Sequence, residues 1–257
     1  MNIRWSHKDE ASAVRRFGRQ GVSAPVARCI YASRLLGAQK QLIVHGGGNT
    51  SVKTKMRDAL GQLIDVIFVK SSGQNLANIN IDGFTALDLE SLKNFESLDS
   101  LQDYQMLNAL SKAKVDITSL APSVETLIHA FLPLPYIFHT HANSILAITN
   151  QIDGNKLASK VLGGNTIVLP YTISGFALAK KAALEFRKNP HASSFVVMKH
   201  GIFSFGCSAE EAFENMIRPI SLAENQIKRS RKRIHSRRVR KTKVPSKANL
   251  APLLRGA

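Results

Sequence analysis

The chain has 257 residues, 44% of them hydrophobic and 21% charged, which is enough apolar material for a sizeable core and excludes a disordered protein. The formal net charge is +17, but basic residues gather at 228–257 and the remainder is only mildly basic. Two cysteines, Cys29 and Cys207, exclude a disulfide framework or a zinc ribbon. No apolar run approaches the ~20 residues that span a bilayer and residues 1–19 contain no signal-peptide core, so we expect a cytoplasmic protein.

Two helices and a glycine-rich loop open the chain. Apolar residues at helical spacing predict helices over residues 7–20 and 23–38. Residues 41–44 are predicted to form a short strand that leads into His-Gly-Gly-Gly-Asn-Thr-Ser at 45–51. Glycines let a backbone come close to a ligand, so this loop is a candidate anion site. It matches neither the P-loop nor the dinucleotide pattern, and a hairpin between strands is the alternative interpretation.

A second polar turn follows a strong strand. The apolar residues at 63–69 predict this strand, which ends in the Ser-Ser-Gly turn at 71–73. Its hydroxyls and free amides suit phosphate, although ordinary turn chemistry explains the same residues. We further predict a pair of short strands with a turn within residues 81–89 and a helix over 99–110.

The central motif of the chain is His139-Thr140-His141, at the end of an apolar run, 134–138, that is typical of a buried strand. Residues two apart in a strand point to the same side, so both imidazoles can reach one ion; two histidines that merely hydrogen-bond at a strand end are the alternative. His200 follows another apolar strand, 195–198, and Glu125 is predicted to lie on a short helix that carries His129 four residues later. Three neutral imidazoles with an open position are a common way to hold catalytic zinc, and a nearby carboxylate can ligate it or act as a base.

The rest of the chain alternates strands and helices. The sequence predicts a helix after Ala142, a strand over 166–169, a helix over 176–188 and a chain reversal after His200. A capping box at 208–211 predicts a last helix through residue 227, kinked at Pro219. We therefore predict one domain, 1–227, and a basic flexible tail, 228–257.

These motifs together resemble the class II aldolase/adducin family. The resemblance covers roughly residues 24–227 in the expected order: the Gly-Asn-Thr-Ser loop at 48–51, the turn at 71–73, Pro-Ser-Val-Glu at 122–125 with His129, His139-Thr140-His141, and Lys-His-Gly at 199–201. Five motifs in one order are specific, whereas none of them would be alone.

The resemblance implies a three-layer α/β/α sandwich around a mainly antiparallel sheet. It also implies a homotetramer with sites between subunits, and one Zn2+ per chain held by His139, His141 and His200. Glu125 would take a proton from the carbon next to a carbonyl, because an enediolate needs both a base and stabilisation of its negative charge. The matching positions for a substrate phosphate are Asn49, Ser72, Gly73 and Ser123.

Three positions depart from the family pattern. Val124 stands where relatives have a second serine, which removes one phosphate donor. No tyrosine occurs in 155–162, before Gly163-Gly164-Asn165, and Tyr171 matches a structural Pro-Tyr, so the proton donor of a fuculose-phosphate aldolase has no counterpart. Lys199 replaces a commoner Asn or His.

The leading hypothesis is a zinc-dependent aldolase acting on a sugar phosphate or a related hydroxy-carbonyl compound. Alternatives within the family are a pentulose-phosphate epimerase and a dehydratase. A different class is a non-catalytic, adducin-like interaction domain, which the complete set of histidines and Glu125 disfavours. The tail could bind nucleic acid or an acidic membrane, but it has no aromatic residues for stacking, and a solvated extension is the favoured interpretation.

Overall fold

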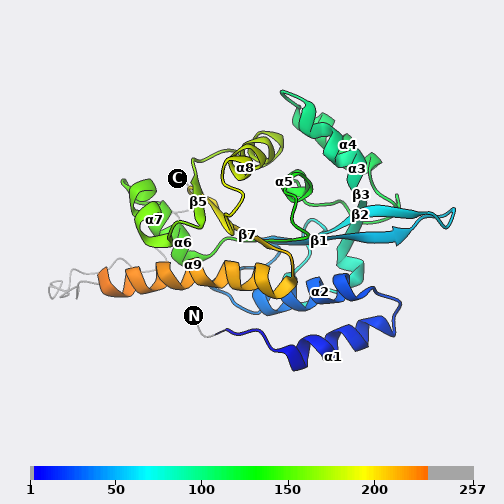
Figure 1. The fold of residues 1–257 in the computed structure, drawn as a ribbon, viewed down its shortest axis with the longest axis horizontal. Helices are drawn as coiled ribbons and strands as arrows, with labels where there is room; N and C mark the ends of the chain where they lie inside the picture. Colours follow the sequence, from blue (N-terminus) through cyan, green and yellow to red (C-terminus); the bar gives the residue numbers. More distant parts are fainter. Residues whose placement is uncertain (1–2, 231–257) are drawn as a thin grey trace, which may run out of the picture.

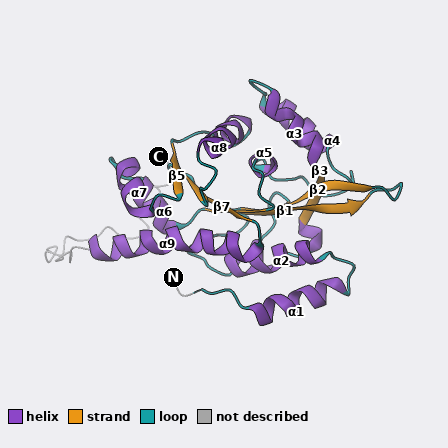
Figure 2. Cartoon of the chain, in the orientation of Figure 1, coloured by secondary structure: helices purple, strands orange, loops and turns teal. Residues whose placement is uncertain are grey.

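A seven-stranded sheet lies between two layers of helices in the computed structural model, which describes residues 3–230 (Figures 1 and 2). The strand order is β3-β2-β1-β4-β7-β6-β5, and every neighbouring pair is antiparallel except β5 and β6. The strands are β1 Asn49–Arg57, β2 Leu63–Lys70, β3 Phe84–Asp88, β4 Tyr136–Thr140, β5 Thr166–Leu169, β6 Ser194–Val197 and β7 Gly201–Gly206. The predicted α/β/α fold with a mainly antiparallel sheet is confirmed.

Five helices cover one face of the sheet, and Figure 1 shows α1, α2 and α9 together on that side. They are α1 His7–Gly18, α2 Ala24–Gly37, α6 Asn143–Thr149, α7 Gly154–Leu162 and α9 Ala209–Ser230. Their buried residues share a core with Val52, Phe138 and Ile202 of the sheet. The last helix is continuous through Pro219, and it extends past the predicted domain boundary at residue 227. The other residues of the predicted tail, 231–257, lie outside the described part of the chain.

The opposite face carries the helices nearest the candidate site. They are α3 Leu89–Asn94, α4 Asp103–Lys112, α5 Thr126–Phe131 and α8 Phe176–Lys188. Ile137 of β4 and Phe203 of β7 belong to this second core. Because side chains alternate along a strand, His139 projects from β4 on the same face as Ile137. Among residues 3–230, no helix is long and apolar enough to cross a membrane.

Two predicted strands are wrong. Residues 41–44 form turns, in which the N–H groups of Leu42 and Ile43 both donate to the Gln39 carbonyl, and the strand instead begins at Asn49. Residues 81–89 contain a single strand, β3, which follows the short 3-10 helix Ile81–Gly83. In residues 41–44, Leu42 and Ile43 are buried by packing without strand pairing, whereas in 81–89 only β3 pairs, with β2. The helix α7 was not predicted.

Gly48 joins the glycine-rich loop to β1 in a conformation that only glycine adopts easily. Its φ is +66°, and a Cβ atom there would lie 2.6 Å from the His139 carbonyl oxygen. Gly61, in the β1–β2 turn, has a φ of +78° and open space around its Cβ position. We expect Gly61→Ala to cost about 1 kcal/mol through backbone strain alone, and Gly48→Ala roughly 3 kcal/mol through strain and collision. Denaturant unfolding of both variants measures the difference, and equal losses would contradict the close approach.

Candidate metal centre

Three histidines from two places in the chain meet beside β4. His139 is the fourth residue of β4, His141 follows the strand directly, and His200 lies in the turn that joins β6 to β7. The pairing of β4 with β7 sets His139 opposite Phe203 and so brings this turn to the end of β4. One ligand nitrogen from each histidine lies within 4.8 Å of the others, and the Nε2 atoms of His139 and His141 are 2.9 Å apart. Nitrogens around a tetrahedral zinc ion lie roughly 3.4 Å apart, so the group is close to the size such an ion requires.

The surroundings of His139 prepare its ring to bind a metal. Its Nδ1–H donates to the Ile202 carbonyl at 3.0 Å, which leaves the Nε2 lone pair free to face the other histidines. The ring stacks on Phe203 with centroids 4.0 Å apart. Burial lowers the pKa of His139 to about 3, and burial also lowers the pKa of His141. Both imidazoles are therefore neutral near pH 7, as metal ligands must be.

The Glu125 carboxylate lies against this group of histidines, at the residue just before α5. Its Oε1 is 3.2 Å from His200 Nε2, and its Oε2 is 3.5 Å from His139 Nε2. Burial opposes ionisation of this side chain, but His139, His200 and a hydrogen bond from Asn49 lower its pKa to about 2. The carboxylate is thus ionised at neutral pH and is able to accept a proton.

A chain of hydrogen bonds from β1 fixes the orientation of Glu125. Asn49 Nδ2 donates to Glu125 Oε2 at 2.6 Å and to Ser123 Oγ at 3.2 Å. The side-chain oxygen of Asn49 can only accept, so His129 Nε2–H donates to it at 2.5 Å. The other ring nitrogen, His129 Nδ1, then accepts a hydrogen bond from the Ser51 hydroxyl at 2.7 Å. Burial lowers the pKa of His129 to about 3, which keeps this ring neutral. Asn49, His129 and Ser51 therefore hold the Glu125 carboxylate in one orientation.

The residues expected to bind phosphate occupy two adjoining segments. Asn49 and Ser123 are buried and in contact with each other. Ser72 and Gly73 are exposed on a turn, which is attached by a 2.8 Å hydrogen bond from the Ser72 N–H to the Ala121 carbonyl. This turn abuts the glycine-rich loop, because a Cβ atom at Gly46 would lie 3.0 Å from the Gly73 oxygen.

Two polar residues at this site were not predicted. Lys70, at the end of β2, is buried, and its Nζ donates to the Gly46 carbonyl at 2.9 Å. Burial lowers the pKa of Lys70 to about 8, and the negative charge of Glu125 opposes this shift. The sequence did carry a signal for Lys70, because a lysine directly after the apolar residues of a strand is unusual. Ser174 donates to Glu125 Oε1 at 3.0 Å, a contact across 49 residues for which the sequence carries no pattern.

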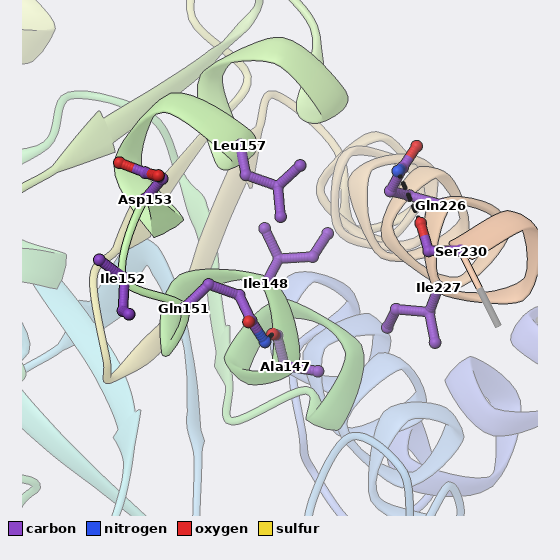
Figure 3. Close-up of a pocket in the computed structure, with 9 residues that line it drawn as sticks. All are labelled: Ala147, Ile148, Gln151, Ile152, Asp153, Leu157, Gln226, Ile227 and Ser230. Carbon is purple, nitrogen blue, oxygen red and sulfur yellow. Dashed lines mark hydrogen bonds between the residues drawn. The ribbon is translucent and has the colours of Figure 1, made fainter. Parts of the chain in front are cut away.

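Two cavities differ in their chemistry. One of about 650 Å³ lies among α6, α7 and the end of α9, where Ile148, Leu157 and Ile227 face one another (Figure 3). Among the described residues that line it, Asp153 is the one titratable side chain. The other, about 540 Å³, has His141 and His200 in its wall and is therefore the cavity next to the metal centre.

Comparison with known proteins places this fold and its group of histidines in a family that includes metal-dependent aldolases. Residues 27–227 match the family model of the Class II Aldolase and Adducin N-terminal domain. The chain belongs to this family, which confirms the resemblance found in the sequence.

Individual relatives fit the same assignment. The solved N-terminal class II aldolase domain of a conserved protein from Thermoplasma acidophilum is 38% identical, with a TM-score of 0.78 over 88% of this chain and 99% of that one. The L-fuculose-1-phosphate aldolase of Thermus thermophilus, 19% identical with a TM-score of 0.51 over 79% of this chain and 95% of that one, shares the fold. A Bacillus subtilis protein named uncharacterized oxidoreductase YuxG is 35% identical over 79% of this chain, which spans only 29% of that protein's length.

Proposed function

We propose that this chain is a zinc-dependent aldolase that cleaves or forms a carbon–carbon bond in a sugar phosphate or a related hydroxy-carbonyl compound. The observation that carries the proposal is the meeting of three imidazoles and one carboxylate in a single group beside β4. The donor set fits the ion, because three imidazole nitrogens with an open fourth position suit Zn2+. When bound to His139, His141 and His200, the ion would act as a Lewis acid towards the substrate carbonyl.

Glu125 is the proposed base in this reaction. Its carboxylate would accept a proton from the carbon next to the carbonyl, or from the hydroxyl whose carbon is released, depending on the direction of the reaction. Asn49 and Ser174 hold its two oxygens from different elements, so the carboxylate is already oriented before a substrate arrives. Pre-orientation of this kind spares the reaction the entropy of ordering the base.

The substrate phosphate is proposed to bind where the two glycine-containing turns adjoin. Asn49, Ser72, Gly73 and Ser123 offer amide and hydroxyl donors there. Lys70 adds a cation, which compensates for the donor lost at Val124. Anions bind well where a charged donor and backbone N–H groups converge.

The charge on Lys70 gives a test with a pH signature. Lys70→Met is expected to raise KM for a phosphorylated substrate about tenfold with little change in kcat, because it removes a charge-assisted hydrogen bond. Lys70 is charged below its pKa of about 8 and loses that charge as the pH rises, so affinity in the unchanged protein should fall through this range, and the variant should lack the fall. The control is Lys55→Met, which removes a lysine from the exposed ion pair between Lys55 of β1 and Asp65 of β2. If KM were unchanged in Lys70→Met, Lys70 would not be part of the anion site.

A substrate panel tests the reaction itself. The zinc-loaded protein is incubated with ketose 1-phosphates, pentulose phosphates and methylthioribulose phosphate, with and without a chelator, and the products are read by NMR. We expect two smaller carbonyl products, lost with chelator and restored by Zn2+. An epimer or a dehydrated ketone would assign the same site to the two alternative reactions. Protein of normal fold that neither takes up zinc nor turns over any of these compounds would favour the adducin-like interaction domain.

The remaining parts of the proposal concern the whole protein. We propose a cytoplasmic enzyme of carbohydrate metabolism that assembles as a homotetramer, as the family resemblance implies. The chain up to Ser230, where α9 ends, would form its catalytic domain, and we propose that the basic segment after it has no specific nucleic-acid partner. Sedimentation of the purified protein, with and without nucleic acid at low salt, tests the assembly and the extension together.

A further inference from the structure

The cavity beside the metal centre has room for a part of the substrate that the phosphate site does not hold. It has a volume of about 540 Å³, and its lining residues come from three stretches of the chain, within 141–150, 171–174 and 199–200. Asn49, Ser72, Gly73 and Ser123 are not among them. A substrate bound to the ion through its carbonyl, with phosphate on the Ser72 side, would therefore extend its other end into this cavity.

The charge in the wall of this cavity is cationic. Its lining includes hydroxyl and amide groups but no carboxylate, and Lys199 carries its one permanent charge. In residues 3–230 the Lys199 ammonium makes no hydrogen bond and no ion pair; only the backbone N–H of this residue is bonded, to Thr149 Oγ1 at 3.4 Å. Lys199 lines the cavity and is exposed, so its ammonium is free to bind an anion that enters there.

The backbone holds Lys199 in a conformation that lysine does not favour. Its φ is +60°, in the left-handed region where Gly and Asn are preferred. Among the described residues, His45 is the only other non-glycine residue with a positive φ, and it also lies in a loop of the candidate site. Strained residues of this kind concentrate at functional sites, and here the strained residue immediately precedes the proposed ligand His200.

We propose that Lys199 binds an anionic group, a carboxylate or a phosphate, at the end of the substrate remote from the Ser72–Ser123 phosphate site. The inference rests on the proposed function and narrows its substrate class to hydroxy-carbonyl compounds with an anion at both ends. A neutral polyol end would leave the ammonium without a charged partner. A carboxylate or phosphate would gain a charge-assisted hydrogen bond from Lys199. The Glu125 carboxylate, which contacts the lining residues Ser174 and His200, is already held by hydrogen bonds from Ser174 and Asn49.

Three matched inhibitors test this directly. Each is an N-alkyl phosphoglycolohydroxamate, whose hydroxamate chelates zinc and whose phosphate occupies the Ser72 side, while the N-alkyl chain ends in a hydroxyl, a carboxylate or a phosphate. Calorimetry on the zinc-loaded protein is expected to show the two anionic ends binding about 5- to 10-fold more tightly than the hydroxyl end. The stronger of the two identifies the natural terminal group.

Variants at position 199 separate charge from backbone. Lys199→Asn suits a positive φ and removes the charge, so it should abolish the preference while the hydroxyl-ended probe binds as before. Lys199→Arg should retain the preference, as should Lys160→Gln, which removes an exposed charge from α7. Equal affinities for the three probes, or a preference that survives Lys199→Asn, would overturn the inference and leave the metal site standing. If the affinities of all three inhibitors were the same with and without zinc, the proposed function would be overturned as well.

Discussion

Replacing Glu125 by Gln is expected to lower kcat by about 10³-fold, since an amide cannot accept the proton that the carboxylate takes from the substrate. The amide is nearly isosteric, and Glu125 is not one of the three residues grouped as ligands, so the zinc content should stay at about one per chain. Steady-state kinetics and metal analysis on the same preparation measure both quantities. The matched control is Glu214→Gln, at an exposed position on α9, which should leave kcat unchanged.

Two outcomes would alter this account in different ways. A Glu125→Gln protein that keeps kcat within threefold would show that the carboxylate is not the base. A variant that loses its zinc would instead make Glu125 a ligand, which its distances of 3.2 and 3.5 Å to the ring nitrogens of His200 and His139 leave geometrically within reach.

Replacing His200 by Ala is expected to abolish activity by releasing the metal. Loss of partners that merely orient a ligand weakens metal affinity 10- to 100-fold, so loss of a ligand itself should weaken it by more than about 100-fold. After dialysis the variant should hold less than about one tenth of the zinc bound by the unchanged chain. The fold should persist, because His200 lies in a turn and its side chain is only partly buried.

The exposed His191 provides the control for this experiment. His191→Ala removes an imidazole from the surface and should change neither zinc content nor activity. A His200→Ala protein that retains both would show that the three histidines do not share an ion, and the chemistry proposed for the site would have to be abandoned with it.

Strand positions were predictable wherever an apolar run ends at a polar motif. The run before His139 and the run before His200 each predicted a strand close to the observed one. The expectation that these histidines meet came from metal-ligand chemistry and from the family resemblance. Residues 41–44 show the limit of this reasoning. Leu42 and Ile43 are buried under the helices without pairing to a strand, and composition does not distinguish these two kinds of burial.

The candidate site was predictable only in its most specific residues. Histidine spacing and ordered motifs pointed to the metal group and to Glu125, because those residue types have few other uses at such positions. Ser174 and Lys70 act through tertiary contacts, with Glu125 and with the Gly46 carbonyl, that depend on how loops settle around the sheet. Local pattern says nothing about such contacts, and only coordinates reveal them.

Anomalous X-ray scattering at the zinc edge, from crystals of the unchanged protein, is the most direct test of the central assignment. We expect one peak per chain, about 2.1 Å from a nitrogen of each of His139, His141 and His200. Crystals of zinc-supplemented protein that show no peak there, or a peak held by other residues, would contradict it.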